Sequence, residues 1–96
     1  MTAKEDGGRW EACLEGDLDA ATLDVFTQFL DGAPPRATIV LEMDSLMFMD
    51  SSGLRALLRA HLAGRSLVLK NPRPEVIRIL QIAEVLDLFP VETDSV

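Results

Sequence analysis

The run Thr38-Ile39-Val40-Leu41 and the nearby segment Asp50-Ser51-Ser52-Gly53-Leu54 decide the fold class of this chain. A short apolar, partly β-branched run is typical of a strand that is covered on both faces. Asp and Ser are preferred helix caps, and Leu54, Leu57 and Leu58 recur at the spacing of a helix. The two segments therefore predict a central strand that leads through a polar turn into a helix.

The flanking sequence repeats this alternation of strands and helices. Period-two alternation predicts a strand over residues 9–15, and apolar spacing predicts a helix capped by Asp19 that stops at Asp31-Gly32. A further strand is expected at residues 66–69, a helix from Pro74 to about residue 84, and a short strand at 88–91. Long crossovers predict an α/β domain with a mixed, largely parallel sheet of four to five strands and about three helices, packed mainly on one face.

The composition limits the classes of function. The 96 residues include 9 Lys and Arg against 16 Asp and Glu, a formal net charge of −7. This acidity argues against direct nucleic-acid binding. With a single Cys13 and a single His61, neither an intrachain disulfide nor a Cys/His zinc site is expected. No long apolar run or signal peptide is found, so we expect a cytoplasmic chain without membrane insertion.

The segment from Asp50 to Gly53 is the best candidate site. In one interpretation Ser51 or Ser52 caps the helix and Gly53 relaxes the turn. In the other, Ser51 accepts a phosphate, with Ser52 as second choice, because helix N-termini stabilise anions. Paired carboxylates without a cleft and the lack of a glycine-rich phosphate loop argue against an enzyme. No catalytic residue, cofactor or metal is expected.

Several segments together resemble the signature of STAS domains, the family of bacterial anti-sigma factor antagonists and sulphate-transporter tails. They are residues 39–42, 48–54 and 56–58, supported by Gly16-Asp17-Leu18-Asp19 and by residues 64–69. The resemblance covers about residues 9–91 and implies a single STAS-like domain. We assign residues 1–96 to it, with 1–8 and 92–96 as frayed tails.

The resemblance implies a signalling module of the antagonist type. In that family an anti-sigma factor that is also a serine kinase binds the unphosphorylated antagonist and phosphorylates the first hydroxyl residue after the Asp, here Ser51. Such a chain would be a monomer or a weak homodimer. The expected partner-binding residues are Asp19, Met49, Asp50, Ser51, Ser52, Gly53, Leu54 and Arg55.

Two alternatives stay open. A STAS domain can also be an unphosphorylated subunit of a transport complex, such as the cytoplasmic partner of a phospholipid-transport ATPase. Asp44-Ser45-Leu46 matches the tripeptide that carries phosphopantetheine in acyl-carrier proteins, with Ser45 as the acceptor. The strand-like runs at residues 38–42 and 66–69 oppose this all-helical alternative.

This chain also departs from the family pattern. The polar residues 1–8 leave open the first edge strand that many STAS domains carry, and Arg55 stands where small residues are common. Arg55 would either pair with a phosphate or alter partner choice. Of the apolar residues Met43, Met47, Phe48 and Met49, most are expected in the core and one or two on a partner surface.

Overall fold

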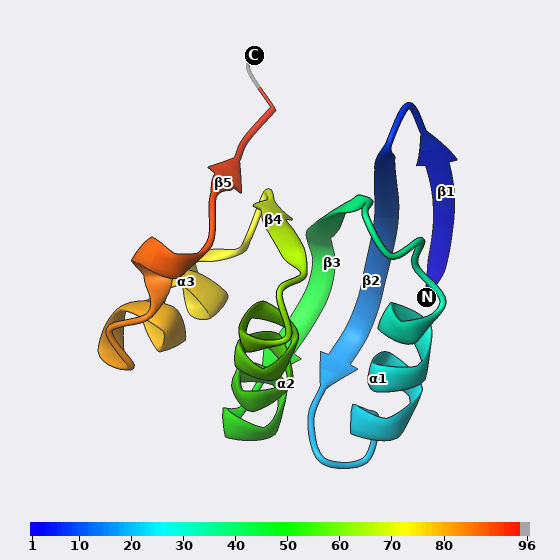
Figure 1. The fold of residues 1–96 in the computed structure, drawn as a ribbon. Coiled ribbons are helices and arrows are strands. Elements are labelled where there is room, and N and C mark those ends of the chain that lie inside the picture. Colours follow the sequence, from blue (N-terminus) through cyan, green and yellow to red (C-terminus); the bar gives the residue numbers. More distant parts are fainter. Residues whose placement is uncertain (95–96) are drawn as a thin grey trace.

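A five-stranded sheet in the order β1-β2-β3-β4-β5 forms the centre of the computed structural model, which describes residues 1–94 (Figure 1). The strands are β1 (Thr2–Asp6), β2 (Arg9–Leu18), β3 (Thr38–Met49), β4 (Ser66–Lys70) and β5 (Val91–Glu92). The first pair is antiparallel and the other three pairs are parallel. The helices are α1 (Leu23–Asp31), α2 (Ser51–Leu62) and α3 (Pro74–Ile82), and a 3₁₀ turn (Leu86–Leu88) precedes β5. The predicted mixed, largely parallel α/β sheet with three helices is confirmed.

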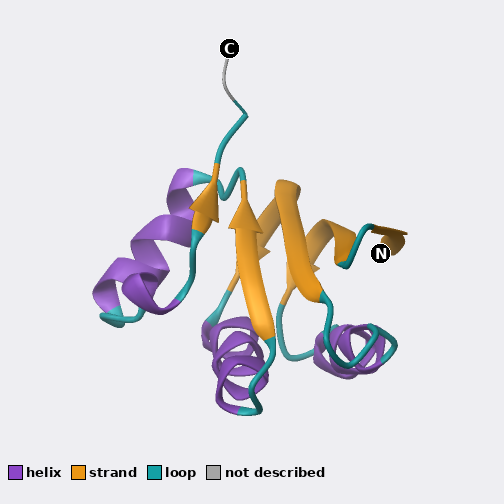
Figure 2. Cartoon of the chain, turned by 45° about the horizontal axis from the view of Figure 1, so that its top comes forward, coloured by secondary structure: helices purple, strands orange, loops and turns teal. Residues whose placement is uncertain are grey.

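One face of the sheet and the inner faces of the helices form a single core. Because side chains alternate along a strand, Ile39, Leu41 and Met43 of β3 all point to this side and are fully buried. They meet Phe26 of α1 and Leu57 of α2 in the same cluster. Figure 2 shows α1 and α2 side by side beneath the strands. The core therefore fixes the helices against one face of the sheet, as expected.

The opposite face of the sheet carries polar side chains around two buried valines, Val40 of β3 and Val68 of β4. Glu42 of β3 and Lys70 of β4 form an ion pair at 3.8 Å, and Arg9 of β2 contacts Glu92 of β5 at 3.0 Å. The hydrogen bond to Glu92 raises the pKa of Arg9 above its ordinary value. Exposed pairs of this kind contribute little stability. These charged side chains indicate that this face of the sheet is in contact with solvent and is not covered by another layer of helices or strands from residues 1–94.

The expectation of a frayed start is wrong for residues 2–6, which form β1. Gly7 and Gly8 both adopt positive φ, at 57° and 85°, and join β1 to β2 in a two-residue hairpin in which Asp6 pairs with Arg9. All five β1 residues are exposed. The strand is therefore formed by backbone pairing, which a polar sequence does not reveal.

The C-terminal segment also differs from its prediction. The last strand lies at Val91–Glu92 instead of 88–91. Asp94 is also held by two hydrogen bonds to the side chain of Asn71. Its N–H donates to Oδ1 of Asn71 at 2.9 Å, and its carboxylate accepts from Nδ2 of Asn71 at 3.0 Å. The expected frayed tail at 92–96 is thus wrong for residues 92 and 94. Residues 95 and 96 lie outside the described part of the chain.

The acyl-carrier alternative does not fit this architecture. Ser45 lies within the long strand β3, although it is exposed, and the five-stranded sheet is incompatible with an all-helical carrier bundle. Within residues 1–94, no helix is both long enough and apolar enough to cross a membrane.

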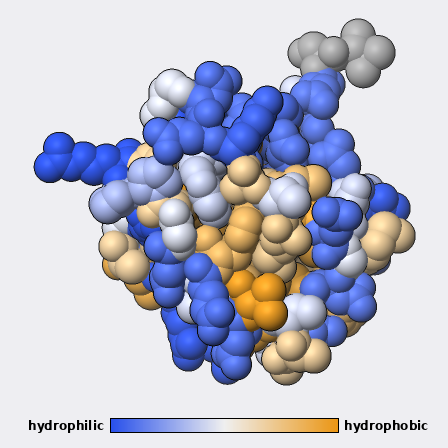
Figure 3. Space-filling model, turned by 90° about the vertical axis from the view of Figure 1, so that its right-hand side faces the viewer, coloured by the Kyte–Doolittle hydropathy of each residue, from blue (hydrophilic) through white to orange (hydrophobic). Residues whose placement is uncertain are grey.

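The side of the molecule that carries β1 and α1 exposes apolar surface. Viewed from there, apolar residues gather in a hollow at the middle, bordered by hydrophilic ones (Figure 3). On α1, Val25 is 60% exposed. Phe29 of α1 packs on Trp10 of β2 with ring centroids 4.9 Å apart, so Trp10 lies at the edge of the core.

Arg65 holds the end of α1 in place. Its guanidinium donates to the carbonyl oxygens of Leu30, Ala33 and Pro34, each at 3.0 Å. Helices end with carbonyls that lack intrahelical partners, and a cation there also complements the helix dipole. Arg65 therefore links the C-terminal end of α1 to the loop between α2 and β4.

We predict that Arg65→Ala lowers the free energy of unfolding by about 2 kcal/mol, because hydrogen bonds from a charged donor are lost at half-buried carbonyls. Urea denaturation measures this change. Arg36→Ala is the matched control, since Arg36 is exposed in the neighbouring loop, and its effect should stay below about 0.5 kcal/mol. Equal effects of the two substitutions would contradict the role of Arg65.

The Cys13 thiol is poorly disposed to ionise. Burial raises its pKa above the ordinary value, and the nearby carboxylates of Glu15, Glu42 and Asp44 raise it further. A raised pKa means less thiolate at any given pH, and the thiolate is the reactive form.

We therefore predict that Cys13 of the folded chain reacts more slowly with dithionitrobenzoate near neutral pH than Cys13 of the urea-unfolded chain. The folded-state rate should continue to rise with pH beyond the ordinary thiol pKa. Glu15→Gln removes one of the three carboxylates and should increase the rate at constant pH. Identical pH profiles for the folded and unfolded chains would refute the shift.

Candidate functional site

The carboxyl ends of β2 and β3 lie together. Leu18 pairs with Met49, and the N–H of Asp50 donates to the carbonyl oxygen of Leu18 at 3.3 Å. Asp19 and Asp50 are therefore the residues that follow two neighbouring strand ends. Ligand and partner sites of parallel sheets commonly lie at this edge, where helices begin. The sequence-predicted residues Asp19 and Asp50–Arg55 are thus brought to one edge of the sheet.

An irregularity in β3 exposes two apolar side chains just before this edge. Gly16 pairs with Leu46 but Asp17 pairs with Phe48, so Met47 is an extra residue in β3. A bulge of this kind breaks the inward–outward alternation. As a result Met47 is 60% exposed and Phe48 is 50% exposed.

Met49 is a correction to the predicted site. It was expected to contact a partner, but the structure buries it at 2% exposure, beneath the start of α2. Met43 is also fully buried. Met47 and Phe48 are therefore the two members of the Met/Phe group that face solvent. Sequence reasoning had no means of choosing them, because the choice depends on the position of the bulge.

Asp50 caps α2, so the interpretation in which Ser51 or Ser52 is the cap is wrong. The Oδ1 atom of Asp50 accepts from the N–H of Ser52 at 2.8 Å and from the N–H of Gly53 at 3.4 Å. Asp50 itself is extended, with φ −109° and ψ −168°, as an N-cap residue should be. Because Asp50 caps the helix, neither the Ser51 nor the Ser52 hydroxyl is needed as the cap.

Ser51 is the exposed hydroxyl of this edge. It is the first residue of α2, and within residues 1–94 its side chain makes no hydrogen bond. Ser52 is half-buried. Arg55 is exposed and lies four residues after Ser51, which places the two side chains on the same face of the helix. Leu54 is half-buried and packs against the core, so it offers only part of its surface.

Asp19 shapes the turn before α1 rather than capping the helix as its N-terminal residue. Its Oδ1 accepts from the N–H groups of Ala21 and Thr22 at 3.0 and 3.1 Å. Thr22 is the N-cap of α1, and its hydroxyl donates to the carbonyl oxygen of Asp17 at 2.9 Å. Asp19 is half-buried beside the site, where its carboxylate is largely engaged by the turn.

Gly53 lets α2 approach the strands closely. A Cβ at this position would lie 2.7 Å from Cγ of Met49, 2.8 Å from the carbonyl oxygen of Leu18 and 2.9 Å from Cγ of Leu18. Real Cβ atoms do not approach neighbours so closely. Gly53 is thus needed for its lack of a side chain, because its φ is not positive. Gly53 is buried, and the close approach that it permits positions Ser51 and Ser52.

The arrangement offers an exposed hydroxyl at a helix N-terminus next to exposed apolar side chains. Among the described residues, no group of three or more His, Cys, Asp or Glu side chains is placed to hold a metal ion. His61 is half-buried and packs edge-on against Phe89 with ring centroids 5.6 Å apart. An exposed hydroxyl can accept a covalent group, and exposed apolar side chains can contact another protein.

Comparison with known sequences gives a consistent family relationship. The model of the STAS domain family matches residues 9–95. An anti-sigma F factor antagonist of Paenibacillus polymyxa is 31% identical over 90 residues, which cover 86% of this chain and 77% of that protein.

Solved structures show the same fold. A Thermotoga maritima protein, described as a candidate anti-sigma factor antagonist, superposes with a TM-score of 0.81 at 15% identity, covering 99% of this chain and 86% of that one. The anti-sigma factor antagonist SpoIIAA in its unphosphorylated form gives a TM-score of 0.76 at 20% identity, covering 98% of this chain and 87% of that one.

We predict that Gly53→Ala destabilises the fold by about 1–3 kcal/mol, because the added methyl group forces α2 away from β2 and β3. Thermal denaturation followed by circular dichroism measures the loss. Ser51→Ala is the control in the same helical turn, and it should leave the melting temperature nearly unchanged, since Asp50 supplies the cap. If Gly53→Ala is as stable as Ser51→Ala, the close approach of α2 is not required.

Proposed function

Because this chain belongs to the STAS domain family, we propose that it is an anti-sigma factor antagonist regulated by phosphorylation. In its unphosphorylated form it binds an anti-sigma factor that is also a serine kinase. That kinase transfers the γ-phosphoryl group of ATP to the Ser51 hydroxyl, and the phosphorylated chain is released. The role is one of reversible protein binding in the cytoplasm, without catalysis by this chain.

The observation that carries the proposal is the free, exposed hydroxyl of Ser51. Asp50 satisfies the N–H groups of Ser52 and Gly53, so a phosphate on Ser51 does not have to displace the cap. The helix N-terminus favours an anion at this position, and Arg55 lies on the same face of α2. The folded chain can therefore accept the modification without loss of structure.

The surroundings of Ser51 account for release. Met47 and Phe48 are exposed at the end of β3, a few residues before Ser51, and exposed apolar groups of this kind are suited to a protein interface. A phosphate carries about −1.5 to −2 charges at neutral pH, and a dry interface tolerates such a charge poorly. The phosphate also adds to a chain that is already at −7. Phosphorylation would thus leave the fold intact while it weakens binding.

The relatives support this assignment through their described roles. The Paenibacillus polymyxa relative is an anti-sigma F factor antagonist, and SpoIIAA is an antagonist whose structure is that of an unphosphorylated form. This chain has a hydroxyl residue directly after Asp50, which a transport-complex subunit that is not phosphorylated would not need.

We predict that Ser51→Glu weakens binding to an anti-sigma kinase from the same genome by about tenfold or more, a change of about 1.4 kcal/mol. Ser51→Ala should bind as the wild-type chain does and should resist phosphorylation. Isothermal titration calorimetry measures affinity, and mass spectrometry after incubation with kinase and ATP locates the phosphate.

Ser52→Ala is the matched control, because Ser52 is the adjacent hydroxyl and is half-buried. It should be phosphorylated normally. A phosphate that persists on Ser51→Ala and disappears on Ser52→Ala would move the site to Ser52. Tight binding to a transport ATPase, together with no phosphorylation by the kinase, would favour the transport-complex alternative.

A further inference from the structure

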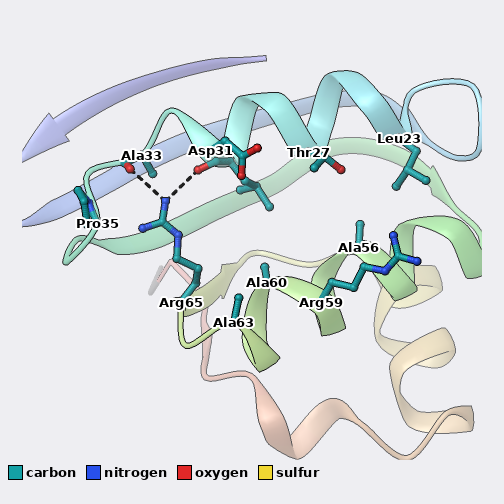
Figure 4. Close-up of a pocket in the computed structure, with 11 residues that line it drawn as sticks. Leu23, Thr27, Asp31, Ala33, Pro35, Ala56, Arg59, Ala60, Ala63 and Arg65 are labelled. Carbon is teal, nitrogen blue, oxygen red and sulfur yellow. Dashed lines mark hydrogen bonds between the residues drawn. The ribbon is translucent and has the colours of Figure 1, made fainter.

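An apolar groove of about 500 Å³ separates α1 from α2 on the surface away from the sheet (Figure 4). On the α2 side the groove is lined by a row of small residues at spacings of four and three, namely Ala56, Ala60 and Ala63. Leu23 and Leu30 line the α1 side. The small side chains of α2 leave the space unfilled.

Hydrogen bonds from Arg65 within the folded chain fix one end of the groove. Arg65 lies at the end formed by Ala33, Pro35 and Ala63 (Figure 4), and its guanidinium is occupied by three carbonyl oxygens. It therefore fixes the end of α1 and is poorly placed to serve as an anchor for a bound anion. The groove is preformed, which lowers the entropic cost of filling it.

The groove carries an exposed charged side chain near each end, in addition to the guanidinium of Arg65. Arg59 of α2 lies at the end near Leu23 and Ala56, and Asp31 of α1 lies at the other end (Figure 4). Both side chains are exposed, and among residues 1–94 neither forms an ion pair. Complementary charges select partners and orient them.

The dimensions suit a helix. From Ala56 to Ala63 the row of small residues spans about 10 Å at 1.5 Å per residue. Apolar residues at positions i, i+4 and i+7 of an amphipathic helix span the same length, and small residues opposite them permit close approach. Thr27, Asp31 and Ala63 on the rim are exposed, so the groove opens to solvent along its length and does not enclose a ligand.

We propose that this groove binds an amphipathic helix of a partner protein, whose apolar stripe lies on the alanine row and whose acidic residue faces Arg59. The inference goes beyond the Ser51 switch, because Arg59 lies two turns of α2 away from Ser51. It gives the chain a second docking surface that does not depend on phosphorylation.

The test uses a synthetic helical peptide of four turns with leucines at spacings of three and four and a glutamate at one end of the stripe. We expect it to shift the amide resonances of α1 and α2 in the ¹⁵N-labelled chain. Thr27→Arg, which fills the groove from an exposed position, should weaken binding by about tenfold or more. Gln28→Arg is the control, because Gln28 is exposed on α1 but does not line the groove.

Charge reversal tests the orientation. Arg59→Glu should weaken binding of the glutamate peptide several-fold, and a peptide with lysine in place of glutamate should regain affinity for that variant. Arg78→Glu on α3 should change neither. Ser51→Glu should bind the peptide as the wild-type chain does, so a failure of the switch and a failure of the groove give different results.

Three outcomes would overturn the proposal: no binding of either peptide, binding that Thr27→Arg does not reduce, or resonance shifts that map outside the groove. Sodium octanoate is tested in parallel. Saturable binding of octanoate in the groove, with no binding of the peptides, would assign the space to a small amphiphile instead of a helix.

Discussion

The contact between Gly53 and the paired ends of β2 and β3 determines where α2 begins. The parallel pairing places Leu18 beside Met49, and α2 then packs so closely on both that no side chain fits at Gly53. The direction of α2 follows from this contact. Every exposed group on the helix, from Ser51 at its start to Arg59 two turns later, takes its position from it.

The order of strands and helices could be predicted, because the spacing of apolar residues distinguishes helices from strands. The long crossovers between the strands indicated a largely parallel sheet. The antiparallel β1 could not be predicted, since its exposed side chains contribute no pattern and a glycine hairpin with backbone bonds forms it. The bulge at Met47 was equally hidden, because register depends on pairing between two strands. Sequence identified the segment that holds Ser51. It did not distinguish Asp50 from the serines as the cap, because all three are good capping residues.

The helix α2 combines three surfaces in twelve residues. Gly53 and Leu57 are buried in the core, Ser51 and Arg55 are exposed at its start, and Ala56, Ala60 and Ala63 border the groove beside α1. A chain of 96 residues has little room for separate binding elements. If Ser51 at the start of α2 is phosphorylated and the groove beside α2 binds a helix, this one helix would give the small domain two separate binding surfaces.

Amide hydrogen exchange in the presence of the anti-sigma kinase would test most directly whether partners recognise the start of α2. Mass spectrometry of the unphosphorylated chain, with and without the kinase, would follow exchange peptide by peptide. We expect the strongest slowing in peptides that cover residues 47–55, and no slowing there once Ser51 carries a phosphate. Unchanged exchange over residues 47–55 in a saturated complex would contradict the proposed binding site.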